Sequence, residues 1–188
     1  MFRYRFVKKL SGAVMASALL CGCAGNNGAP DNSISSALSV LETVWNSYAE
    51  EERFFVVGGN QENAKEGAPA VFDVEKTEEL ESMFLVPKKE ASSVEDAASM
   101  VHAMNTNVFS SVVFQIKEGV DIKSFMAMLE KEGSEKKWLC GAPEILSISQ
   151  LNEDTISLTF GTEENVKKFV DILSSKYKDI LTIQENIA

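Results

Sequence analysis

The chain is poor in the side chains on which most enzymes depend. Its 188 residues include one histidine, His102, and three cysteines, Cys21, Cys23 and Cys140. Any histidine-dependent triad or metal site would therefore have to use His102. The sequence has no Cys-x-x-Cys pair, no histidine pair at helical spacing and no alternating aspartate loop, so we expect neither a zinc nor a calcium site.

Motifs for binding phosphate or nucleotides are also missing. The sequence contains no P-loop, no dinucleotide-binding glycine pattern and no serine nucleophile elbow. We therefore expect no cofactor and favour a noncatalytic protein over an enzyme. The two glycines of "VVGGNQ" are interpreted as part of a turn.

The sequence lacks a membrane-spanning run, although its start is typical of an exported protein. Residues 1–9 carry four basic side chains and no acid, and residues 10–20 are apolar or small. This order is that of a secretory signal. The apolar stretch is about half the roughly 20 residues that a transmembrane helix needs, so we expect no permanent helical anchor.

The segment Leu20 to Cys23, "LCGC", resembles the lipobox of bacterial lipoproteins, with an aliphatic residue three positions before the modified cysteine and a small residue directly before it. Cys23 has Leu20 and Gly22 at those positions, whereas Cys21 would have the bulky Leu20 directly before it. The resemblance implies cleavage after Gly22, a lipidated Cys23 carrying acyl chains such as palmitate, and attachment to the extracytoplasmic face of the bacterial cell membrane. Two or three acyl chains make such an anchor persistent. The alternative is an ordinary secreted protein that is cleaved elsewhere.

The charge balance narrows the choice of partners. Removal of residues 1–22 takes away 4 of the 18 basic residues and none of the 28 acids, which leaves 14 minus 28, or a net charge of −14. So negative a chain is not expected to bind nucleic acid or to lie flat on an anionic membrane.

Composition divides the chain into three parts. Residues 1–22 form the predicted signal peptide, and residues 23–36 are rich in Gly, Asn, Ser and Pro, as expected of a flexible tether. Residues 37–188 are long enough for one α+β domain with a real core.

The pattern is clearest in residues 108–187. Alternation predicts strands at 108–117, 144–151, 155–161 and 179–184, and helical periodicity predicts helices at 121–133 and after Thr162. The order strand, helix, strand, strand, helix, strand is that of the ferredoxin-like split βαβ unit, βαββαβ. We therefore expect one antiparallel sheet with both helices on the same face.

Residues 34–107 are harder to interpret. Apolar periodicity predicts helices at 34–48, 73–84 and 92–107, the last with Val94, Ala97, Val101 and Met104 facing inward. Residues 54–74 are predicted to be a short strand and a long loop. The helices could cover the far face of the sheet or sit at its edge, and that face would be mildly polar because Ser and Thr side chains line it.

Cys140 is the one chemically suggestive residue of the predicted domain. Nearby Lys136 and Lys137 could lower the pKa of its thiol and make it reactive. A thioredoxin-type pair needs a second cysteine three positions on, where Pro143 stands, so we favour a buried, unreactive Cys140. Candidate residues for a binding surface are Trp138, Cys140, Gly58, Gly59 and Asn60.

The segments "VWNSYAEEERFFVVGG", "HAMNTNVFS" and "WLCGAP" resemble a family of small bacterial lipoproteins. Some members of that family are labelled bacteriocin transport accessory protein. Proteins for which the label has a basis resemble thioredoxin and use a Cys-x-x-Cys pair. This chain lacks the pair, so the resemblance points to the cell envelope and implies no redox role for Cys140.

Three functional hypotheses stay open. The favoured one is a lipid-anchored, noncatalytic binding or accessory module with a protein partner in the envelope, because the anchor signal is clear and catalytic groups are sparse. The second is a thiol-dependent redox enzyme that uses Cys140. The third is a structural envelope lipoprotein.

The lipobox assignment predicts which cysteine carries the anchor. Cys23→Ala should abolish incorporation of labelled palmitate and release the protein from the membrane fraction, because the modified thiol is gone. Cys21→Ala is the matched control and should leave both properties unchanged. Equal palmitate incorporation by the two variants would contradict the assignment.

Overall fold

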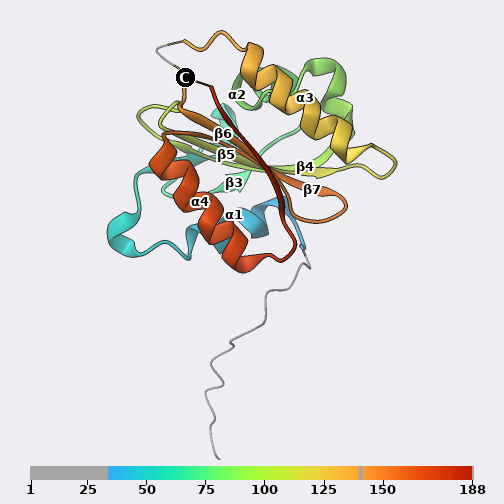
Figure 1. The fold of residues 1–188 in the computed structure, drawn as a ribbon. Helices are drawn as coiled ribbons and strands as arrows, with labels where there is room; N and C mark the ends of the chain where they lie inside the picture. Colours follow the sequence, from blue (N-terminus) through green and yellow to red (C-terminus); the bar gives the residue numbers. More distant parts are fainter. Residues whose placement is uncertain (1–33, 140–141, 188) are drawn as a thin grey trace, which may run out of the picture.

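The central element of the fold is one antiparallel sheet. Among residues 34–139 and 142–187, which the computed structural model describes, eight strands join this sheet (Figure 1). The predicted α+β class is confirmed. In chain order the strands are β1 (Val56–Gly58), β2 (Lys65–Glu66), β3 (Ala70–Val71), β4 (Val94–His102), β5 (Phe109–Ile116), β6 (Ile145–Gln150), β7 (Thr155–Gly161) and β8 (Leu181–Asn186).

Helices complete the described part of the chain. The α-helices are α1 (Ala37–Trp45), α2 (Thr77–Phe84), α3 (Ile122–Glu135) and α4 (Glu163–Lys176). Short 3-10 helices connect them: η1 (Glu50–Glu52), η2 (Gln61–Asn63) and η3 (Lys88–Ser93). The helices predicted within 34–48, 73–84 and 121–133 and after Thr162 are therefore present, as are the four strands predicted in residues 108–187.

Two helices, α2 and α3, cover one face of the sheet. Leu158 of β7 is fully buried there, in a core that also contains Phe84 of α2 and Leu129 of α3. Ile156 and Phe160 belong to the same core, so the alternation predicted for this strand is confirmed.

Gly133 lets α3 approach the sheet closely. The sequence predicted that the helix ends at this glycine, but α3 continues to Glu135. A Cβ atom at position 133 would lie 2.4 Å from Leu146 Cδ1 of β6. Gly133 is thus a packing residue inside the helix and not its C-terminal cap.

The opposite face carries α1 and α4, and its chemistry differs. In Figure 1, α1 (blue) and α4 (orange-red) lie across the sheet from α2 (green) and α3 (yellow). Aromatic and aliphatic side chains of these helices, among them Trp45 and Phe169, pack with Phe109 and Val113 of β5. Between them lies a layer of small hydroxyl side chains from the central strands, at most 1 % exposed: Ser111, Ser147, Ser149, Ser157 and Thr159.

This arrangement corrects one expectation and answers one open question. The helices predicted to share one face, α3 and α4, lie on opposite faces, and the Ser and Thr face is closed. Of the two placements left open for the N-terminal helices, α1 takes the far face, where it contacts β4, β5 and α4. Mild polarity did not keep this face open, and some of the hydroxyl groups bond to one another: Ser111 Oγ lies 2.9 Å from Thr159 Oγ1, whereas Ser147 Oγ is buried without a hydrogen-bond partner.

Strand order explains why the helices separate. The order is β2-β1-β4-β5-β7-β6-β8, with β3 also paired to β4. In a ferredoxin-like unit the last strand would pair with β5, but β4 occupies that edge and β8 pairs with β6 instead. The connections β5–α3–β6 and β7–α4–β8 therefore both cross the sheet in the same direction, toward β8. Their starting strands, β5 and β7, are antiparallel to each other. Right-handed connections then put their helices on opposite faces. The ferredoxin-like topology is not confirmed.

The helix predicted over 92–107 is wrong, since η3 ends at Ser93 and β4 then runs from Val94 to His102. β4 is buried from both sides, with Ala97 in one core and Ala98 in the other. Such a strand lacks polar alternation, so its apolar residues can also match a helical period. Met104, predicted to face inward, is 85 % exposed beyond the strand.

The start of α1 is fixed by its cap and by the sheet. Ser36 and Ser39 form a capping box, as each hydroxyl accepts a hydrogen bond from the other's backbone N–H. Asp96 of β4 accepts a further bond from the Ala37 N–H at 2.9 Å. A carboxylate is favourable beside a helix N-terminus, so this contact also positions α1 on the sheet.

The two closed faces predict that neighbouring residues of β7 are both sensitive to substitution. Leu158→Ala should lower the free energy of unfolding by about 2 to 5 kcal/mol through an unfilled cavity. Ser157→Leu should lower it by about 1 to 3 kcal/mol, because the larger side chain has no room under α1 and α4. Urea denaturation measures both, with Glu153→Ala in the exposed turn as the control, expected within about 0.5 kcal/mol of the unsubstituted protein. If Ser157→Leu were as harmless as the control, the face would be open.

Candidate functional site

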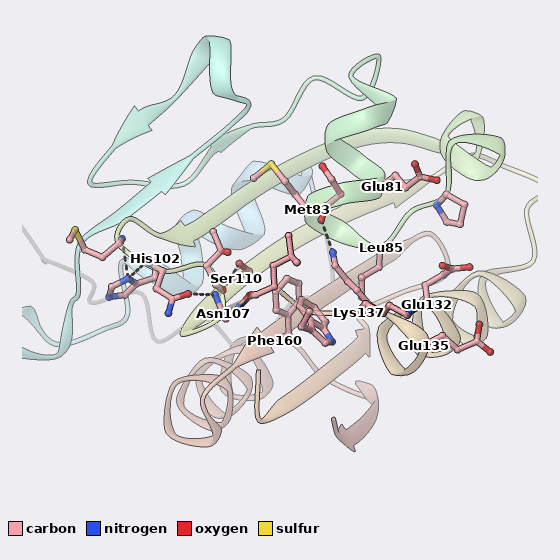
Figure 2. A pocket seen from close by; sticks show the side chains of 18 of the residues that line it. Glu81, Met83, Leu85, His102, Asn107, Ser110, Glu132, Glu135, Lys137 and Phe160 are labelled. Carbon is pink, nitrogen blue, oxygen red and sulfur yellow. Dashed lines mark hydrogen bonds between the residues drawn. The ribbon is translucent and has the colours of Figure 1, made fainter. Parts of the chain in front are cut away.

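A groove of about 980 Å³ lies on the α2–α3 side of the sheet, where these helices end. Its walls come from three segments that are distant in sequence: 81–87 with the end of α2, the β4–β5 loop 102–107, and 132–139 with the end of α3. Figure 2 shows Phe160 and Ser110 between the acids of α2 and α3 at one end and His102 and Asn107 at the other. The volume is within the range of small-molecule sites.

Aromatic and aliphatic side chains form the floor of the groove. The half-buried Trp138 packs on Phe160 of β7, with ring centroids 5.1 Å apart. Leu85, at the end of α2, has a left-handed backbone with φ of 63° and is buried beside them. A leucine rarely adopts this conformation, so the surrounding core must hold Leu85 in place.

The β4–β5 loop is organised around His102. Its Nδ1 accepts hydrogen bonds from the backbone N–H groups of Met104 and Asn105, each at 3.2 Å. The ring also stacks on Phe54, at 5.5 Å between centroids. Because Nδ1 accepts, the neutral imidazole carries its proton on Nε2 and has no free lone pair to act as a base. His102 is therefore a structural residue of the groove wall.

Lys136 brings a positive charge to the apolar part of the groove. Its Nζ donates to the carbonyl oxygen of Ser82 at 2.6 Å and lies 4.8 Å from the centroid of the Trp138 ring. Burial lowers the pKa of Lys136, since a half-buried ammonium loses part of its hydration. The contact also ties the segment after α3 to the end of α2.

Two large apolar side chains at the groove are exposed. Met104 is 85 % exposed and Leu139 is 84 % exposed, the highest values among the large hydrophobic residues that the structure describes. The backbone near Leu139 is nevertheless held, because Asn107 Nδ2 donates to its carbonyl oxygen at 2.9 Å. Exposed apolar side chains beside a fixed concave surface are typical of binding sites.

The candidate residues from the sequence are only partly brought together. Trp138 lies in the groove, whereas Gly58, Gly59 and Asn60 do not line it. Cys23 and Cys140 lie outside the described residues, so their predicted roles stay predictions. The sequence missed Lys136 as a groove residue in its own right, and it missed the β4–β5 loop because residues 92–107 were predicted to be helical.

Gly58 ends β1, and Gly59 and Asn60 form the bend that follows it, so the turn interpreted in "VVGGNQ" begins at the second glycine. Gly59 has φ of 86°, and its N–H donates to Ser99 Oγ at 2.9 Å. Asn60 is 1 % exposed, and its side-chain amide bonds to backbone groups of Asp73. The polar groups of this turn are thus used inside the fold.

The turn predicts that Gly58 is needed for folding. A Cβ atom at position 58 would lie 2.3 Å from the backbone nitrogen of Ala70, and backbone cannot move aside cheaply. Gly58→Ala should therefore lower the free energy of unfolding by about 1 to 3 kcal/mol in a urea titration. Gln61→Ala, at an exposed side chain of the next turn, is the control and should have little effect. Unchanged stability of Gly58→Ala would contradict the close approach.

Other classes of site find little support in the described residues. Residues 34–139 and 142–187 contain no cluster of three or more His, Cys, Asp or Glu side chains placed to hold a metal ion. Within the same ranges, no helix combines the length and apolarity needed to cross a membrane.

Comparisons with protein-family models, with curated proteins and with solved structures found no match to the chain.

Proposed function

We propose that this chain is a lipid-anchored lipoprotein of the extracytoplasmic membrane face, and that it acts as a noncatalytic binding module through the groove beside Trp138. The main support for the proposal is the groove itself, with Trp138 and Phe160 on its floor and the exposed Met104 and Leu139 at its edge. Apolar side chains gain free energy when a ligand covers them. The anchor is inferred from the lipobox at Leu20 to Cys23.

The position of α1 supports a groove that stays accessible when the chain is anchored. The domain begins at Ala37, whose N–H bonds to Asp96 near the start of β4, and α1 lies on the face opposite to α2 and α3. The groove lies at the other end of β4, beside His102. At about 3.3 Å per residue, these two ends of the strand are roughly 20 Å apart. The predicted tether therefore joins the domain away from the groove and leaves the groove accessible to a partner.

Among the described residues of the groove, His102 and Lys136 are both engaged in structural contacts. His102 uses Nδ1 to hold its own loop, so it is not poised to activate a nucleophile. Lys136 is bonded to a backbone carbonyl and packed on Trp138. With both side chains engaged in this way, we favour ligand binding over catalysis as the role of the groove.

Site-specific photocrosslinking tests the proposal. A benzoylphenylalanine residue at position 139 or 104 of the full chain should give a discrete crosslinked product in the bacterium that makes the protein. The same residue at position 71 or 181 is the control, since Val71 and Leu181 are also exposed, by 55 % and 52 %, but do not line the groove.

The products at 139 and 104 should weaken when Trp138→Ala is added, because the substitution removes the aromatic floor. Equal products at all four positions, or products at the control positions alone, would contradict a binding role for the groove. Rapid labelling of Cys140 by a maleimide in the native protein would favour the thiol-dependent enzyme instead.

A further inference from the structure

Lys136 is a half-buried ammonium with unused hydrogen-bonding capacity. The cation–π contact with the Trp138 ring favours the charged amine, whereas burial lowers the pKa of Lys136. An ammonium can donate three hydrogen bonds, and Ser82 accepts one of them. The Trp138 ring covers another side of the charge.

This charge has no counterion in the described part of the chain. The ion pairs found there include those of Lys76, Lys88, Lys89, Lys167 and Lys168, and none uses Lys136. A charge that is partly removed from water normally has a partner of opposite sign. An anionic group of a ligand would supply this partner and bond to the free N–H groups.

The acids of the groove restrict what that ligand can be. Glu81, Glu132 and Glu135 line one end of the groove, together with the exposed Lys137 (Figure 2). The chain as a whole has a net charge of −10. A ligand that is negative along its length would be repelled. A matching ligand would carry one carboxylate for Lys136 and an apolar group for Trp138. Positive charges farther along the ligand would match the three acids.

We propose that the groove binds the C-terminal end of a peptide. The free carboxylate bonds to Lys136 Nζ, the last, apolar side chain packs on Trp138, and basic side chains farther back lie toward Glu81, Glu132 and Glu135. A volume of about 980 Å³ has room for several residues of such a chain. The inference rests on the proposed binding role of the groove and names its ligand class.

Selection from a peptide library tests the inference. The full chain, extracted in detergent, is incubated with synthetic hexapeptides that are each present in a free-carboxylate form and in an amidated form. Peptides with a free carboxylate, an apolar last residue and Lys or Arg before it should be enriched about tenfold over their amides, because the amide cannot form the charge-assisted bond.

Three variants separate the role of the charge from its neighbours. Lys136→Met should abolish the preference for the carboxylate, and Lys136→Arg should keep it. Lys131→Met, at an exposed lysine of α3 that does not line the groove, is the matched control and should not change the preference. Thermal unfolding of each variant shows whether it is folded. The comparison of carboxylate with amide on the unsubstituted protein does not depend on any variant.

Equal enrichment of carboxylates and amides, a preference that survives in folded Lys136→Met, or no enrichment at all would overturn the inference. If position 139 still gives a specific crosslinked product in those cases, the binding role of the groove stands and only the ligand class is wrong. If position 139 gives no such product either, both proposals fail.

Discussion

The double burial of the central strands is the constraint on which the rest of the structure depends. β5, β7 and β6 carry large aliphatic and aromatic side chains on the face toward α2 and α3, and mostly small hydroxyl side chains toward α1 and α4. A buried hydroxyl group destabilises a fold unless it is hydrogen-bonded. Several of these groups bond to one another across strands, as between Ser111 and Thr159 and between Ser149 and Thr182, both at 2.9 Å, whereas Ser147 Oγ has no hydrogen-bond partner.

The groove follows from this arrangement. With α1 and α4 on one face, the other face is covered by α2 and α3. These two helices do not reach the end of the sheet where Ser110 and Phe160 lie, and both residues line the groove there. The uncovered end is walled by the β4–β5 loop and by the segment after α3. Hydrogen bonds fix both walls, through His102 in the loop and from Lys136 to the end of α2. The surface offered to a ligand is therefore largely formed in advance, which lowers the entropic penalty of binding.

Local pattern in the sequence predicted most of the elements but not how they assemble. The strands and helices of residues 108–187 were identifiable because one side of each meets a core and the other is more polar, as in Ile156, Ser157 and Leu158. β4 failed this test because both of its sides carry apolar residues, such as Ala97 and Val101 toward one core and Ala98 and Met100 toward the other. The topology could not be derived either, since it depends on whether β4 or β8 pairs with β5, and no local pattern encodes that choice.

The candidate site was predictable only in part for the same reason. Trp138 stood out as a rare aromatic residue beside lysines, and it does lie in the groove. The walls combine segments 81–87, 102–107 and 132–139, which only the fold brings together. Gly58 and Gly59 were conspicuous in the sequence, but their conformations serve a turn.

Hydrogen–deuterium exchange tests most directly whether the doubly buried sheet holds the molecule together. The account predicts that backbone amides of β5, β6 and β7 exchange slowest and at a common rate, because they open only when the whole domain unfolds. Amides of β8 should exchange much faster, since this strand lies at the edge of the sheet and most of its residues are exposed. If β7 exchanged as fast as β8, the central strands would not be closed on both faces, and the account would be contradicted.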